Sequence, residues 1–94
     1  MKLSLENKLF DAIENNDSIS FVNLLLKMGE GIDIVNCRDM FNNTPLILTC
    51  LEGNFKIVEL LIDNGADINA KNKYGYTPLK CAIVQKIIQK FKNY

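Results

Sequence analysis

The chain has 94 residues, of which 48% are apolar and 23% charged, and its formal net charge is zero. This composition is that of one small folded domain and excludes an intrinsically disordered chain, which would be poorer in apolar residues. The zero net charge removes any global field that would attract nucleic acid or an anionic membrane. The charge is nevertheless uneven: residues 1–47 carry four Lys/Arg and seven Asp/Glu, and residues 48–94 carry seven and four.

Membrane insertion and secretion are not expected. No apolar run reaches the roughly 18 residues that cross a bilayer, and the N-terminus becomes charged too early for a signal peptide. Cys37, Cys50 and Cys81 are an odd number without a Cys-x-x-Cys pair, so neither a disulfide framework nor a thiolate metal site is predicted. We therefore expect a reducing compartment, the cytoplasm, with the nucleus as the alternative.

The N-terminal third is expected to form a helix hairpin. Apolar residues at helical spacing predict a first helix over residues 3–14. A short polar turn follows, in which Asp17 or Ser18 can cap a second helix over residues 19–28. Gly29 stands just past that helix, where we expect a left-handed residue to satisfy the last carbonyls.

A repeat with a period of 33 residues dominates the rest of the chain. Thr44-Pro45-Leu46 returns as Thr77-Pro78-Leu79, and a period in this range is typical of stacked repeat arrays. In each copy the Thr suits a helix N-cap and the Pro the first helical position. The pattern predicts a short helix from Pro45, a turn at residues 53–54 and a second helix over residues 57–62.

A unit that opens on Thr-Pro-Leu and closes on Gly-Ala-Asp-Ile-Asn (residues 65–69) resembles the ankyrin repeat. The resemblance covers about residues 5–91 and implies an all-α fold, an ankyrin-type helical solenoid of stacked helix-turn-helix repeats with β-turn fingers. We expect a single domain over residues 1–94. Its units are then repeat 1 at about 5–38 as an N-terminal cap, repeat 2 at about 39–71 and repeat 3 at about 72–94 as a shortened C-terminal cap.

Two departures from the family pattern concern the fingers. The pattern has Gly two positions before the Thr, which is met by Gly75 but replaced by Asn42 in the preceding unit. Asn is the best substitute where φ must be positive, so this departure supports the assignment. The family's His after Thr-Pro-Leu is replaced by Ile47 and Lys80, so the hydrogen bonds which that His supplies are expected to be absent.

The third unit has lost its Gly turn. Residues 86–91 echo residues 56–61 at an offset of 30 instead of 33. Either a very tight turn survives and residues 84–91 form a separate, distorted second helix, or one helix continues from Pro78 to near Phe91. We favour the separate helix, because its apolar residues would otherwise have no partner.

Catalysis is not predicted. The chain has no His, the commonest general base near neutral pH, and no Gly-rich phosphate loop or metal-spaced cluster. Cys50 and Cys81 stand at equivalent helix positions and are expected to be buried structural thiols. Asp67 and Asn69 are of residue types that can bind calcium, but turn hydrogen bonds are the better interpretation. We therefore expect no enzyme activity, cofactor or metal.

The resemblance implies that a partner protein contacts the finger tips and the inner side of the short helices. Large side chains on turns, especially Tyr74, together with a basic rim are typical of a protein-binding surface. The alternative is that Phe41 or Tyr76 folds over a neighbouring finger and buries its own ring. The predicted partner-binding residues are Arg38, Met40, Phe41, Asn43, Glu52, Lys71, Lys73, Tyr74 and Tyr76, with Leu51, Val84 and Gln85 nearby on the helices.

A second hypothesis is a structural role, in which the chain is a self-associating segment of a larger ankyrin-repeat assembly without a separate ligand. The C-terminal lysines are interpreted as a solvated cap, since the aromatic interleaving of a nucleic-acid surface is absent. We expect a monomer, and the acidic N-terminal and basic C-terminal halves allow weak head-to-tail association.

Overall fold

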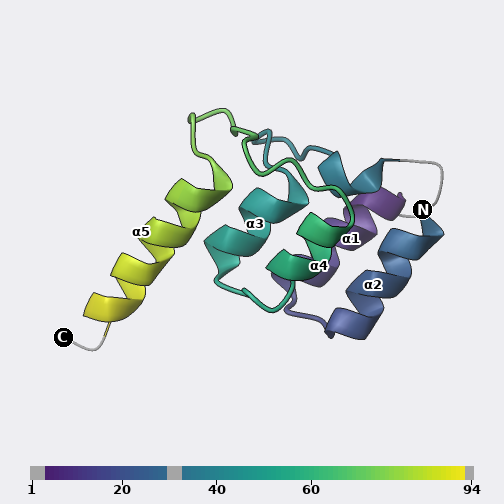
Figure 1. The fold of residues 1–94 in the computed structure, drawn as a ribbon, viewed down its shortest axis with the longest axis horizontal. Helices are drawn as coiled ribbons and strands as arrows, with labels where there is room; N and C mark the ends of the chain where they lie inside the picture. The colour runs from purple at the N-terminus through teal and green to yellow at the C-terminus, as the bar shows by residue number, and fades with distance from the viewer. Residues whose placement is uncertain (1–3, 30–32, 93–94) are drawn as a thin grey trace.

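A computed structural model describes residues 4–29 and 33–92. Within these ranges α3 packs against both α1 and α5, while α2 packs on α1 and α4 on α3. The result is an elongated stack of 44 × 29 × 26 Å with α5 at one end (Figure 1). The elements are α1 (Leu5–Glu14), α2 (Ile19–Met28), the 3-10 turn η1 (Ile34–Asn36), α3 (Pro45–Glu52), α4 (Val58–Asp63) and α5 (Pro78–Phe91).

The α1–α2 hairpin forms as predicted. The Ser4 hydroxyl accepts a hydrogen bond from the Asn7 amide at 3.1 Å, and the Ser18 hydroxyl accepts one from Phe21 at 3.2 Å. Ser18, and not Asp17, is therefore the cap of α2. Such caps satisfy amide groups that have no partner within the first turn of a helix.

The expectation for Gly29 is wrong. Its φ is −83°, outside the left-handed region. A Cβ added at this position would lie 2.7 Å from Cδ1 of Ile34. Gly29 is therefore required for the close approach of η1 to the end of α2, and not for a left-handed backbone.

The two predicted fingers have the same backbone. In the first, the Asn42 amide donates to the Asp39 carbonyl at 2.9 Å, and in the second the Gly75 amide donates to the Asn72 carbonyl at 3.0 Å. Asn42 has φ 62° and Gly75 φ 80°, so both residues take up the left-handed conformation as predicted. Each finger therefore closes with the same turn, 33 residues apart.

The repeated Thr-Pro motif starts α3 and α5 as expected. The Thr44 hydroxyl accepts from the Ile47 amide at 3.2 Å, and the Thr77 hydroxyl accepts from the Lys80 amide at 3.2 Å. A prolyl residue at the first position of each helix costs no hydrogen bond there. The core lies around α3, and its largest fully buried side chains are Leu9, Ile13, Val22, Leu46, Ile47, Ile57 and Leu61.

The preference for a separate helix over residues 84–91 is wrong. α5 is one continuous helix of 14 residues. Without the Gly and polar residues of a turn, nothing interrupts its backbone hydrogen bonds, and a continuous helix avoids the unpaired backbone groups of two additional helix ends. The consequence is exposed apolar surface: Ile87 and Ile88 are 52% and 53% exposed. Across the described residues, no helix is long and apolar enough to cross a membrane.

Candidate functional site

Direct hydrogen bonds join the two fingers to each other. The Arg38 guanidinium donates to the Asn42 carbonyl at 2.9 Å in its own finger and to the Lys71 carbonyl at 2.8 Å in the next. The Asn72 amide group donates to the Asn43 side-chain oxygen at 3.0 Å, and the Lys73 amide donates to the Phe41 carbonyl at 3.1 Å. The finger tips are thus held in a fixed relation.

Each finger is also braced internally by one side chain. A carboxylate oxygen of Asp39 accepts from the Phe41 and Asn43 amides at 2.8 and 2.9 Å. At the equivalent place in the second finger, the Asn72 side-chain oxygen accepts from the amides two and four residues later at 2.9 and 3.0 Å. These side-chain turns fix the backbone that presents the tip residues.

Aromatic rings and lysines gather on the two tips. The Lys73 ammonium lies 4.7 Å from the ring centre of Phe41 and 5.1 Å from that of Tyr74, and so connects one tip to the other. The Tyr74 and Tyr76 rings are 6.4 Å apart at an interplanar angle of 54°, and Lys80 lies 4.6 Å over Tyr76. These distances are within the range of cation–π and tilted aromatic contacts.

The predicted contact residues differ in accessibility. Met40 is 85% exposed and Tyr74 63%, while Phe41 keeps 42% of its surface. Tyr76 is half-buried and packs against the core. Asn43 is only 6% exposed, and its side chain is engaged within the fold. We call Met40, Phe41, Lys71, Lys73 and Tyr74 the finger surface.

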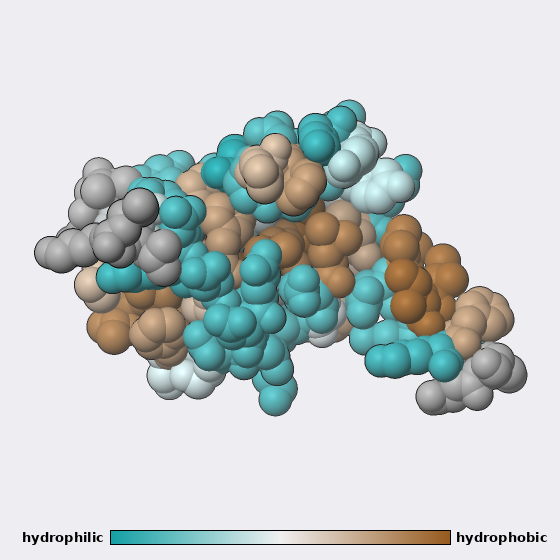
Figure 2. Space-filling model, turned by 180° about the vertical axis from the view of Figure 1, so that it is seen from behind, coloured by the Kyte–Doolittle hydropathy of each residue, from teal (hydrophilic) through white to brown (hydrophobic). Residues whose placement is uncertain are grey.

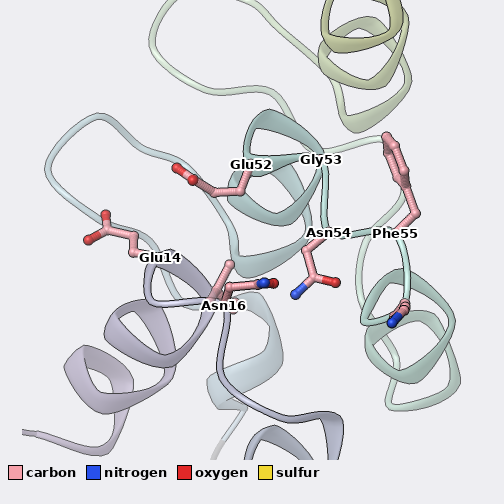
Figure 3. Close-up of a pocket in the computed structure, with 8 residues that line it drawn as sticks. Glu14, Asn16, Glu52, Gly53, Asn54 and Phe55 are labelled. Atoms are coloured by element: carbon pink, nitrogen blue, oxygen red, sulfur yellow. The ribbon is translucent and has the colours of Figure 1, made fainter. Parts of the chain in front are cut away.

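Glu52 lies apart from the finger surface. It is the last residue of α3, seven residues after the Pro that follows the finger, and thus about 10 Å along the helix axis. There it borders a cavity of about 550 Å³ between the α1–α2 and α3–α4 turns. Figure 3 shows the side chains of Asn16 and Asn54 extending toward each other across this cavity, with Glu14 and Glu52 directed to one side. Leu51 and Val84 are exposed on α3 and α5, whereas Gln85 is half-buried.

The cysteine side chains are unsuited to nucleophilic chemistry. Cys50 and Cys81 are buried as predicted, and burial raises the pKa of Cys50 to about 11 and that of Cys81 above its usual range. Cys37 is half-buried, and burial together with the nearby Glu6 carboxylate raises its pKa to about 11. The thiolate, which is the reactive form, is disfavoured at all three.

The side chains of Asp67 and Asn36 form hydrogen bonds with the backbone of the loop that follows α4. A carboxylate oxygen of Asp67 accepts from the Asn69 amide at 2.9 Å. The Asn36 side chain donates to the Gly65 carbonyl at 3.0 Å and accepts from the Asp67 amide at 2.8 Å. Among the described residues, no group of three or more His, Cys, Asp or Glu could hold a metal ion.

One surface was not predicted from the sequence. An apolar cavity of about 400 Å³ lies where α3, α4 and α5 meet, and Phe55, Ile62, Ile68 and Leu79 are among its lining residues. Figure 2 shows apolar side chains gathered on the α5 end of the molecule. The third unit lacks the turn that would precede a separate second helix, and that second helix is the element expected to cover this surface. The missing turn is therefore the sequence signal that could have revealed it.

Comparison with known proteins finds one matching family model and several related proteins. A family model described as ankyrin repeats, in three copies, matches residues 9–92. An ankyrin repeat protein of Rickettsia bellii (strain RML369-C) is 38% identical over 77 residues, which are 79% of this chain and 30% of the relative. One of Acanthamoeba polyphaga mimivirus is 74% identical over 56 residues, 60% of this chain and 38% of the relative. One of vaccinia virus (strain Copenhagen) is 38% identical over 53 residues, 56% and 10% respectively. The chain thus spans well under half of the length of these relatives.

Proposed function

Since the chain belongs to the ankyrin repeat family, whose repeats are generally protein–protein interaction modules, we propose that it binds a partner protein through its finger surface. The observation that carries this proposal is the exposure of Met40 and Tyr74 on tips that are hydrogen-bonded to each other. Exposed apolar groups that gather in one place, unlike single scattered ones, are typical of interaction surfaces. Fixing their positions before binding lowers the entropy that a complex would lose.

The chemistry of the finger surface indicates the kind of partner. Met40 is an adaptable apolar anchor and Tyr74 a rigid amphipathic one, and side chains of these types are enriched at protein interfaces. Lys71 and Lys73 add positive charge beside them. We propose that the partner presents an apolar side chain flanked by Asp or Glu, so that it meets both features at once.

The finger surface can be tested by protein capture with a matched control. The double variant Met40→Ala, Tyr74→Ala removes both anchors, and Phe55→Ala removes a comparably exposed aromatic ring on the α3–α4 turn. Mass spectrometry of proteins captured from a lysate should give a partner that the wild type and Phe55→Ala retain and the double variant loses. Equal capture by all three proteins would refute the finger surface.

We also propose that the chain has no catalytic activity, as is typical of its family. The raised pKa values of its thiols support this. Its cysteines are unpaired, which supports a reducing, cytoplasmic environment. The division into units at about 5–38, 39–71 and 72–94 stays a proposal, supported by the equivalent turns at residues 39–43 and 72–76.

A further inference from the structure

The outer face of α5 is apolar. Leu79, Ile83 and Ile87 follow one another at four-residue spacing and thus form one stripe along the helix. They are 68%, 51% and 52% exposed, because α5 contacts α3 with its opposite face, where Cys81 and Pro78 are buried. Lys86 and Lys90 each stand three residues after an isoleucine of the stripe, and α5 contains no Asp or Glu. We call Leu79, Ile83, Ile87, Lys86 and Lys90 the tail surface.

The opposite end of the stack has a groove with the complementary charge. The groove lies between α1 and α2 and has a volume of about 440 Å³. Leu25 and the exposed side chains of Phe21 and Met28, which keep 43% and 61% of their surface, contribute its apolar lining. Asp11 of α1, Asp17 of the following turn and Lys8 of α1 also border it, so the two carboxylates and the one ammonium give it a net charge of −1. We call Phe21, Leu25, Met28, Asp11 and Asp17 the head surface.

We propose that the head surface of one copy receives the tail surface of a second copy. The apolar stripe of α5 then lies on Phe21, Leu25 and Met28, and removal of this surface from water drives the contact. The lysines beside the stripe come close to Asp11 and Asp17 at the rim. The opposite charges of the head surface and the tail surface fix the orientation of one copy relative to the other.

The charges select this arrangement over the symmetric ones. Pairing two tail surfaces would bring Lys86 and Lys90 of both copies together without any acidic residue on either helix. Pairing two head surfaces would bring together two grooves that each carry a net charge of −1 with Lys8 included. Like net charges disfavour association, so head against tail is the arrangement that combines apolar burial with a net attraction.

A head-to-tail contact uses different surfaces on the two copies, so it produces short open chains, or rings where the rotation between copies closes. Two short helical stripes bury less accessible surface than a typical stable interface, which buries at least about 1,200 Å². The association is therefore expected to be weak, with a dissociation constant between about 10 μM and 1 mM. The finger surface shares no residue with either end, so it stays available in the assembly.

The decisive experiment uses two variants, in each of which one of the two surfaces is disrupted by a single substitution. Ile87→Asp places a charge in the tail surface, and Met28→Asp places one in the head surface. Both residues are more than half exposed, so neither change should unfold the chain, and circular dichroism checks this. Sedimentation velocity is measured from about 10 μM to 1 mM protein in low and high salt, for each variant alone and for an equimolar mixture.

We expect the average mass of the wild type to rise with concentration, and to rise less in high salt, which screens charges at a surface. Each variant alone should stay monomeric, and the mixture should form dimers that grow no further, because only one intact head and one intact tail remain. A wild type that stays monomeric would overturn the proposal. So would a mixture that fails to associate, or variants that associate alone, which would indicate another contact.

If either Asp variant loses its fold, the charge reversals Lys86→Glu and Asp11→Lys replace them in the same experiment. Each alone should lower the association constant at least tenfold by placing like charges in contact. Their mixture pairs the unchanged ends of the two proteins, and the two reversed ends also carry opposite charges, so the mixture should recover association. Failure to recover association would again overturn the proposal.

Discussion

Backbone conformation at single residues explains how the fingers tolerate sequence change. Asn42 occupies the left-handed region at φ 62°, at the same turn position where Gly75 has φ 80°. A side chain with a Cβ costs roughly 1 kcal/mol there, and Asn is among the few types that adopt this conformation routinely. The turn therefore depends on a residue that accepts positive φ, not on glycine alone.

We predict that Asn42→Ala lowers the free energy of unfolding by about 1 kcal/mol, because Ala has no side chain that compensates for positive φ. Asn42→Gly should change it by less than about 0.5 kcal/mol, since lower strain and a more flexible unfolded chain oppose each other. Urea unfolding measures both variants. The reciprocal pair is the control: Gly75→Asn should cost less than Gly75→Ala, and equal costs would contradict the equivalence of the turns.

The buried thiols predict how stability depends on pH. Burial raises the pKa of Cys50 from its ordinary value of 9.0 to about 11, and Cys37 is raised to about 11 as well. Between these values the unfolded chain loses thiol protons that the folded chain keeps, so stability is full below pH 9 and falls toward pH 11.

Urea unfolding at pH 8 and pH 10.5 should show a loss on the order of 1 kcal/mol from these groups, which is less than the shifts alone would give, because Cys37 is only half-buried and solvent screens its interactions. The comparison is with the double variant Cys37→Ala, Cys50→Ala, because it isolates the contribution of the two thiols. This variant should be less stable at pH 8 but should lose less stability between the two pH values. An unchanged pH slope would show that the thiols do not contribute.

Among the helices, α4 has packing on one side only. Leu61 is fully buried, whereas the adjacent Ile62 is 44% exposed beside the cavity next to α5. We predict that Leu61→Ala costs about 2–5 kcal/mol through lost burial and a new cavity, and that Ile62→Ala costs less than about 1 kcal/mol. Urea unfolding measures both. Equal costs would mean that both sides of α4 are covered in solution, for example by another copy.

The helices can be predicted from the sequence where local signals agree. Caps such as Ser18 and Thr44 and the apolar spacing after them give the start of each helix, so the predicted ends of α2 match the observed ones. Gly29 cannot be interpreted correctly from the sequence, because its role depends on Ile34, a contact across a loop. For α5, the apolar Ile87 and Ile88 favour a separate packed helix, but the absence of any turn residue decides the outcome.

Prediction from the sequence has the same limit for the finger surface. Sequence spacing places Met40 and Tyr74 on turns, and the structure finds both exposed. Spacing cannot tell an exposed turn residue from one held within the fold: Asn43 stands in the same finger as Met40 but is buried and hydrogen-bonded to Asp39 and Asn72. Glu52 shares the repeat but stands at the far end of its helix.

At the scale of the whole molecule, the finger surface and the two ends of the stack are separate in residues and in chemistry. The fingers are fixed by backbone hydrogen bonds between neighbouring units, such as Lys73 to Phe41 at 3.1 Å. The ends depend on exposed apolar side chains of α2 and α5, such as Phe21, Met28 and Ile87. A change at one of these surfaces therefore leaves the contacts of the other intact, and their functions should be independent.

This independence predicts opposite results for two variants. Ile87→Asp should abolish concentration-dependent self-association and leave partner capture unchanged, whereas Met40→Ala, Tyr74→Ala should abolish capture and leave self-association unchanged. Phe55→Ala, which changes an exposed ring outside the finger surface, should retain capture. If Ile87→Asp also reduced capture, binding would require the assembled chain, because avidity from several linked copies can raise an otherwise weak affinity. In that case, a monovalent capture format, with the module immobilised at low density, should also abolish capture by the wild type. If the wild type still captured the partner in this format, Ile87 would instead lie in the partner contact.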